Sequence, residues 1–205
     1  MVEHAQPVLL MAAGVADDDP VGVKLLSKRK IDVDARGSLD RTALMVAALA
    51  GHVQIAEAML AAGANADLGD RNGTSALMEA ARSGSVSIIH ALRKRKVDPN
   101  GVDALGRSAL IIACGSRTAN EEVVRALLAL GANPGIAAND GRRALDHALA
   151  SGRWPIVALL DPTFSLPSNL AAEAASFGLL DDEHDRARNW VCNLGLAAGA
   201  ELEKR

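Results

Sequence analysis

The sequence predicts an all-α protein built from stacked helix-turn-helix units joined by short loops. Three long segments align with one another, and the Ser or Thr that precedes Ala-Leu recurs at Thr42, Ser75 and Ser108, 33 residues apart each time. Apolar residues within each segment recur at spacings of three to four, which places them on one face of a helix. A fixed period of this length is typical of repeat proteins whose units stack into one continuous core.

Composition excludes several classes of function. The 205 residues are 49% hydrophobic and 23% charged, as in folded globular domains. Aromatic residues make up only 2% and the net charge is −3, which argues against nucleic acid or an anionic membrane as a partner. Cys114 and Cys192 are too few for a disulfide framework or a thiolate zinc site. No apolar run reaches the roughly 20 residues of a membrane span.

The apolar stretch 7–16 resembles the hydrophobic region of a signal peptide. The residues before it contain Glu3 and no Lys or Arg, whereas secretory signals start with basic residues. We therefore expect no signal peptide and a cytoplasmic protein.

Each unit is expected to contain two short helices. In one unit, Leu44, Ala47 and Ala48 form the apolar stripe of the first helix, and Ile55, Met59 and Leu60 form that of the second. Gly51 and Gly84 stand where left-handed caps would end first helices. The third unit has two extra residues near 117–120, and Asn120 is expected to cap the helix that follows.

These residues resemble the ankyrin repeat. One unit matches the family pattern at Asp70, Gly73, Ser75, Leu77, Ala80, Ala81, Gly84, Ile88, Ile89 and Leu92, and the next matches at Asp103, Gly106, Ser108, Leu110, Ala113, Leu127, Leu128, Gly131 and Ala132. The resemblance implies an ankyrin-repeat solenoid with short finger loops between units. We expect one domain over 1–205, with repeats at 37–69, 70–102, 103–137 and 138–164, a degenerate repeat at 1–36 and a degenerate capping repeat at 165–205.

Departures from the family pattern carry expectations of their own. Asp40 stands where a finger glycine is usual, so the first finger is expected to be distorted. The proline that usually starts the first helix is replaced by Ala in every clear unit, and the usual histidine is replaced by Met45, Met78, Ile111 or Asp146. The helices should survive because Ala is a good helix former.

No catalytic or metal site is expected. Asp146 and His147 are adjacent on a predicted helix, so their side chains point about 100° apart and cannot form a triad with Ser151. His52 fits a structural position of the repeat, and Cys114 takes the place of a buried alanine. We expect no enzymatic activity and no cofactor.

Basic residues cluster at 28–30 and 93–96, two repeats apart. Each run closes a predicted second helix, where cations complement the helix dipole. The alternative is an edge patch that binds an acidic partner.

The resemblance implies a non-catalytic scaffold or adaptor that binds another protein through finger tips and first helices. The positions concerned are Ser38, Leu39, Arg41, Arg71, Asn72, Thr74, Arg82, Ala104, Leu105, Arg107, Asn139 and Arg142. Leu39 and Leu105 at predicted tips are candidate anchors, and the enlarged turn 116–120 is a further possible contact.

Arg41, Arg107 and Arg142 hold one slot in three repeats. They either bind an acidic segment of the partner or brace neighbouring fingers. A monomer is expected. The alternative function is a docking or sensing domain of a larger enzyme or effector.

Overall fold

The structure is a computed structural model and describes residues 32–164. Within this range it consists of helices and connecting loops, which confirms the all-α prediction. The elements are η1 (Ser38–Asp40), α3 (Ala43–Ala50), α4 (Val53–Ala61), α5 (Ala76–Ser83), α6 (Val86–Arg93), α7 (Ala109–Gly115), α8 (Glu121–Leu130), α9 (Ala144–Ala150) and α10 (Trp154–Leu160). The capping repeat 165–205, the run 28–30, Cys192 and nearly all of the repeat 1–36 lie outside the described residues.

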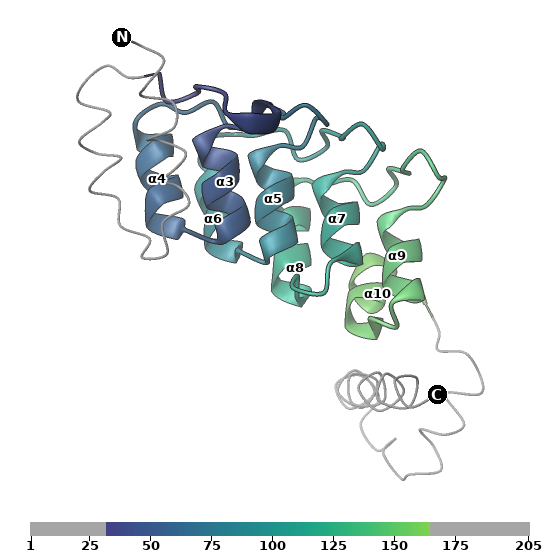
Figure 1. The fold of residues 1–205 in the computed structure, drawn as a ribbon. Coiled ribbons are helices and arrows are strands. Elements are labelled where there is room, and N and C mark those ends of the chain that lie inside the picture. Colours follow the sequence, from purple (N-terminus) through teal and green to yellow (C-terminus); the bar gives the residue numbers. More distant parts are fainter. Residues whose placement is uncertain (1–31, 165–205) are drawn as a thin grey trace, which may run out of the picture. The chain divides into compact units, whose positions relative to one another are not determined.

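The helices form two compact units that divide after Ala144. In the first unit, α3, α5 and α7 lie side by side in one row, and α4, α6 and α8 form a second row beside them (Figure 1). Each of these first helices packs on the second helix of its own repeat, and α5 packs on both α3 and α7. This arrangement repeats the predicted helix-turn-helix unit three times.

The repeated Ser or Thr starts each first helix. The hydroxyls of Thr42, Ser75 and Ser108 accept hydrogen bonds from the backbone N–H three residues later, at 3.4 Å in each case. These bonds satisfy N–H groups that have no partner inside the helix. At the other end, Gly51 and Gly84 adopt the predicted left-handed caps, with φ of 76° and 82°. Residue types at both ends of the first helix therefore set its length.

The core lies between the two rows of helices. Leu44, Ile55 and Met59 are fully buried, as the apolar periodicity predicts, and Leu60 and Leu127 are 3% and 0% exposed. Small side chains line the row of first helices, where Ala47, Ala48, Ala80, Ala81 and Ala113 are 0% exposed. Their size permits the close approach of neighbouring helices. Cys114 is buried in the same layer, as predicted.

The fingers connect the repeats on one side of the first helices. In the second finger, Gly73 adopts φ of 75° and donates to the carbonyl of Asp70 at 2.8 Å. Asp40 takes the equivalent place in the first finger with φ of 59° and donates to Gly37 at 3.1 Å. The turn is therefore retained, and the expected distortion is confined to η1, where Leu39 is also left-handed with φ of 62°. Asp tolerates this conformation better than most residues.

The described part of the second unit is small. α9 and α10 follow each other along the chain, and Ile156 and Val157 on α10 are buried. Trp154 stacks on Phe164 with ring centroids 6.1 Å apart. Within residues 32–164, no helix has both the length and the hydropathy needed to cross a bilayer.

Candidate functional site

An aspartate at the base holds the second and the third finger in shape. The Oδ1 atom of Asp70 accepts hydrogen bonds from the backbone N–H groups of Asn72 and Thr74, at 2.8 and 2.9 Å. Asp103 does the same for Leu105 and Arg107, at 2.9 Å each. Because the carboxylate bridges both sides of the turn, it fixes the direction in which the tip residues point.

Backbone hydrogen bonds also join each finger to the next. Arg71 donates to the carbonyl of Leu39 at 2.9 Å, and Ala104 donates to that of Asn72 at 2.7 Å. The same link joins Asn139 to Leu105, at 2.9 Å. The tips are therefore in register, and equivalent residues of successive fingers form a row.

A cleft of about 420 Å³ lies between the first three fingers and the helix α5. Its lining contains eight of the twelve predicted partner-binding residues, which are Leu39, Arg41, Asn72, Thr74, Arg82, Ala104, Leu105 and Arg107. The other lining residues are Asp70, Glu79 and Asp103, which are not among the predicted partner-binding residues. Stacking thus gathers most of the predicted surface and adds three carboxylates to it.

Leu39 and Leu105 stand at the edge of the cleft with their side chains in solvent. They are 53% and 56% exposed, which confirms their predicted place at the tips. Leu49 and Val102 are also exposed, at 38% and 49%, but they do not line the cleft.

Four predicted residues lie outside the cleft. Ser38 is exposed on η1, and Asn139 donates from its side chain to the carbonyl of Ala104 at 3.1 Å. Arg71 forms an ion pair with Asp40 at 3.8 Å and is 67% exposed. The guanidinium of Arg142 lies 4.0 Å from Asp140, and its side chain is 63% exposed.

Two of the three arginines of the repeated slot brace the fingers. Arg107 donates to Oδ2 of Asp103 through Nε at 2.9 Å and through Nη2 at 2.7 Å. Arg41 donates to Oε1 of Glu79 on α5, in the next repeat. Both guanidinium groups therefore have carboxylate partners within the chain. Arg142 is the most exposed of the three.

The ion pair with Arg107 shifts the titration of Asp103. Burial alone raises the pKa of this carboxyl, but the hydrogen bonds from the Arg107 side chain and backbone, its positive charge and the Leu105 N–H outweigh burial. The net effect lowers the pKa of Asp103 below its ordinary value of 3.8. The carboxylate is therefore ionised in the folded chain at neutral pH.

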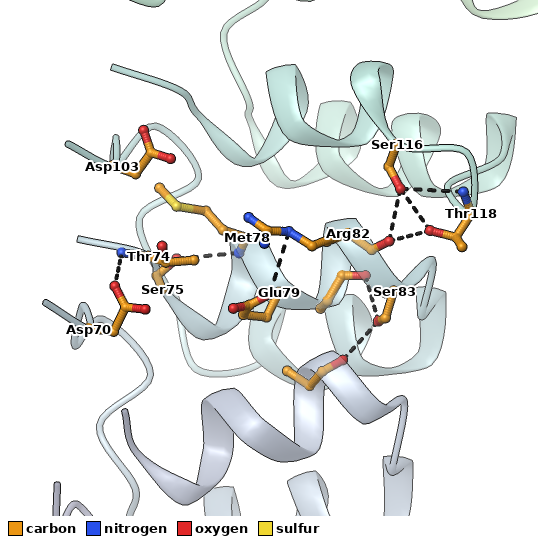
Figure 2. Close-up of polar contacts among 12 residues, drawn as sticks. Asp70, Thr74, Ser75, Met78, Glu79, Arg82, Ser83, Asp103, Ser116 and Thr118 are labelled. Carbon is orange, nitrogen blue, oxygen red and sulfur yellow. Dashed lines mark hydrogen bonds and ion pairs between the residues drawn. The ribbon is translucent and has the colours of Figure 1, made fainter. Parts of the chain in front are cut away.

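Glu79 is the main residue that sequence reasoning missed. It is only 2% exposed, and Arg82 on the same helix approaches its Oε2 atom with Nε at 3.6 Å (Figure 2). A signal was present in the sequence, because Val46 and Ile112 occupy the same place in the neighbouring repeats. A glutamate in an otherwise apolar slot indicates a buried charge with an assigned partner.

The enlarged turn after α7 is attached to the preceding repeat. Ser116 donates from Oγ to the carbonyl of Arg82 at 3.0 Å, and Thr118 donates to the same carbonyl (Figure 2). Asn120 caps α8 as predicted and accepts from Val123 N–H at 3.1 Å. The insertion thus closes the end of α5, while its own tip at Arg117 is exposed.

The basic run 93–96 closes α6 in an exposed position, as predicted. Arg95 donates to the carbonyl of Leu60 in the preceding repeat. This contact adds a bracing role to the favourable charge at a helix C-terminus.

Asp146 and His147 lie next to each other on α9, as expected from the sequence. Across residues 32–164, no three His, Cys, Asp or Glu side chains are grouped as ligands for a metal ion.

Comparison with protein families gives matches over most of the chain. Residues 9–103 match a family model described as ankyrin repeats in three copies, and residues 105–139 match the ankyrin repeat. Comparison with curated proteins gives no match. Ankyrin repeats generally mediate protein–protein interactions, and the family is typically non-catalytic. From the 33-residue period, the stacked helix pairs and these family matches, the chain belongs to the ankyrin repeat family.

Proposed function

We propose that this chain is a non-catalytic scaffold or adaptor that binds another protein through its finger tips and the concave face of the stack. The observation that carries the proposal is the pair of tip leucines at the cleft. Leu39 and Leu105 expose more than half of their surface, although the core beneath them is well packed. Apolar anchors surrounded by polar groups are typical of the centre of a protein interface.

The charge of the cleft supports a protein partner with mixed polarity. Arg41, Arg82 and Arg107 line it together with three carboxylates, so its formal charge is balanced. An acidic segment of the partner would contact Arg142 first, because this arginine is the most exposed of the repeated slot. The protein acts as a monomer in the cytoplasm under this proposal. The net charge of −3 favours a protein over nucleic acid as the partner.

Affinity capture with matched variants tests the proposal. The full chain is compared with the double variant Leu39→Ser and Leu105→Ser and with the control Val102→Ser, which changes an exposed apolar residue outside the cleft. Proteins retained by the wild type and by the control should be lost with the double variant, at unchanged melting temperature. Retention of the same partners by the double variant would refute binding through the tips.

A further inference from the structure

We propose that the cleft recognises a basic side chain of the partner, whose ammonium or guanidinium group donates hydrogen bonds to Asp70 and Glu79. This inference rests on the proposed function and names the chemistry of the group that the cleft accepts. It follows from a shortage of hydrogen-bond donors at two carboxylate oxygens, Asp70 Oδ2 and Glu79 Oε2. Nε of Arg41 is also buried without a hydrogen-bond partner among the described residues, but it lies 3.9 Å from Asp70 Oδ2.

Within the part of the chain that the structure describes, Asp70 lacks a side-chain hydrogen-bond donor because its finger carries Thr74 in place of an arginine. This residue holds the slot that Arg107 holds in the next finger, where the arginine gives Asp103 Oδ2 two hydrogen bonds, at 2.9 and 2.7 Å. The threonine side chain is too short to do the same for Asp70. In the described chain, Oδ2 of Asp70 has only an ion pair with Nε of Arg41, at 3.9 Å, although the aspartate side chain is 7% exposed.

One carboxylate oxygen of Glu79 also lacks a hydrogen-bond donor in the described residues, and this side chain is more deeply buried than that of Asp70. Its side chain is 3% exposed, and its Oε1 atom accepts from Arg41. Its Oε2 atom is buried and has no hydrogen-bond donor among residues 32–164, since Arg82 Nε stays 3.6 Å away. A buried carboxylate oxygen without a donor is costly, so the site favours a group that supplies one.

One cation can serve both carboxylates. Oδ2 of Asp70 and Oε1 of Glu79 lie against neighbouring nitrogens of the same guanidinium group of Arg41, and both side chains line the cleft. Arg82 lies beside Glu79 (Figure 2) and is 42% exposed, so its side chain can turn outward when another donor enters. Three N–H donors of an ammonium group, or the planar fork of a guanidinium group, match such acceptors.

The tip leucines define where this basic residue lies in the partner. Leu39 and Leu105 are two repeats apart, which corresponds to roughly 16–20 Å at about 8–10 Å for each helix-to-helix step. An extended segment covers this span in about five or six residues at about 3.3 Å each. We therefore expect two apolar residues with a Lys or Arg midway between them.

Fluorescence anisotropy with synthetic peptides tests this chemistry on the full wild-type chain. The probe is a capped peptide with Leu near each end at that spacing, Lys at its centre and Ser elsewhere. Matched peptides carry norleucine or Glu at the centre. The Lys peptide should bind about tenfold to a hundredfold more tightly than the norleucine peptide, because hydrogen bonds to charged groups are involved. Equal affinities, stronger binding of the Glu peptide or no binding of the Lys peptide would overturn the inference.

Variants of the protein test whether Asp70 and Glu79 cause the preference for the Lys peptide. Thr74→Arg introduces the side chain that the same slot holds in Arg41 and Arg107, so it should fold, pair with Asp70 and abolish the preference for Lys. Glu79→Gln should reduce the preference about tenfold. Glu57→Gln, an exposed carboxylate on α4, is the matched control and should leave it unchanged. A preference for Lys that survives both Thr74→Arg and Glu79→Gln would place the basic residue elsewhere and refute the assignment.

Failure of this inference can be separated from failure of the proposed function. The double variant Leu39→Ser and Leu105→Ser should weaken the Lys and norleucine peptides alike, since it removes the apolar anchors. If the leucines matter and the central residue does not, the tips bind protein but the basic-residue site is wrong. If the leucines have no effect on peptides or captured proteins, the proposed function itself is wrong.

Discussion

Arg41 on the first finger donates a hydrogen bond to the buried carboxylate of Glu79, 38 residues later on α5. The contact joins one repeat to the next through charge, in addition to the apolar layer of α3 against α5. The arginine is 22% exposed and the glutamate 3%, so the pair is largely removed from solvent. Breaking it is therefore expected to matter more than breaking an ion pair on the surface.

The variant Arg41→Met tests this. It leaves Glu79 as a buried charge with only Arg82 nearby, and we expect a loss of about 3 kcal/mol in the free energy of unfolding. The double variant Arg41→Met with Glu79→Leu should recover most of that loss, because it removes both charges.

Urea denaturation of the wild type, Arg41→Met, Glu79→Leu and the double variant gives the coupling energy between Arg41 and Glu79. Arg125→Met is the control, since Arg125 and Glu121 form an exposed pair within α8 that should contribute about 0.5 kcal/mol or less. A double variant that is less stable than Arg41→Met would contradict the explanation.

Core positions of the second helices provide a second prediction. Leu60 and Leu127 are 3% and 0% exposed, so Leu→Ala at either one should cost about 2–5 kcal/mol. Leu105→Ala changes the same residue type at 56% exposure and should cost less than about 0.5 kcal/mol. Chemical denaturation that ranks Leu105→Ala with the two core variants would show that the repeat frame is misassigned.

The sequence predicted the helices, their caps and the tip leucines because each depends on residues that recur at a fixed period. It also predicted most of the cleft lining. When repeats stack in register, equivalent positions such as Arg41, Thr74 and Arg107 must lie in one row. Sequence periodicity therefore reaches beyond single helices to the composition of a surface.

The ion-pair partners of the arginines could not be read from the same periodicity. Arg107 pairs within its own finger, whereas Arg41 reaches a glutamate of the next repeat. The two differ because the first finger has Gly37 in the place of Asp103, and because Glu79 replaces the apolar residues found at Val46 and Ile112. The ion pairs depend on positions where one repeat differs from the others. The residues that the repeats share therefore do not predict which carboxylate each arginine contacts.

The cap of α5 leads to a third prediction. Gly84 has φ of 82°, and a Cβ added there would lie 2.7 Å from the carbonyl oxygen of Thr118 in the enlarged turn. Gly141 has a similar φ of 79°, but no described heavy atom lies within 4 Å of its added Cβ. Both alanine variants carry the left-handed strain of about 1–2 kcal/mol. Gly84→Ala should lose about 1–3 kcal/mol more, because backbone must shift to relieve the clash.

Thermal and urea denaturation of the two variants check this difference. Equal losses for Gly84→Ala and Gly141→Ala would mean that the turn 116–120 is not held against the end of α5. Ser116→Ala and Thr118→Ala remove the two hydroxyls that donate to the Arg82 carbonyl. Together they should loosen the turn and reduce the extra cost at Gly84.

The pair of Asp103 and Arg107 makes stability depend on pH. The folded pKa of Asp103 is lowered, so between the folded pKa and the unfolded value of about 3.9 the unfolded chain binds more protons. The pair therefore stabilises the fold fully above about pH 4, and its contribution is lost as the pH falls through the folded pKa. At neutral pH, Arg107→Gln should lower the free energy of unfolding by about 1–3 kcal/mol.

That loss should shrink as the pH falls from about 4 through the folded pKa of Asp103, because below the folded pKa Asp103 is protonated in wild type and variant alike. Arg142→Gln is the matched control. It changes the same slot in a later finger, where the side chain is 63% exposed and 4.0 Å from Asp140, so its smaller effect should vary little with pH. Arg107→Glu adds a carboxylate beside Asp103 and should be less stable than Arg107→Gln at neutral pH, with the two converging in acid. Urea denaturation across this pH range measures the loss in the free energy of unfolding for each variant. A loss for Arg107→Gln that stays constant with pH would show that Asp103 is not the group stabilised by the arginine.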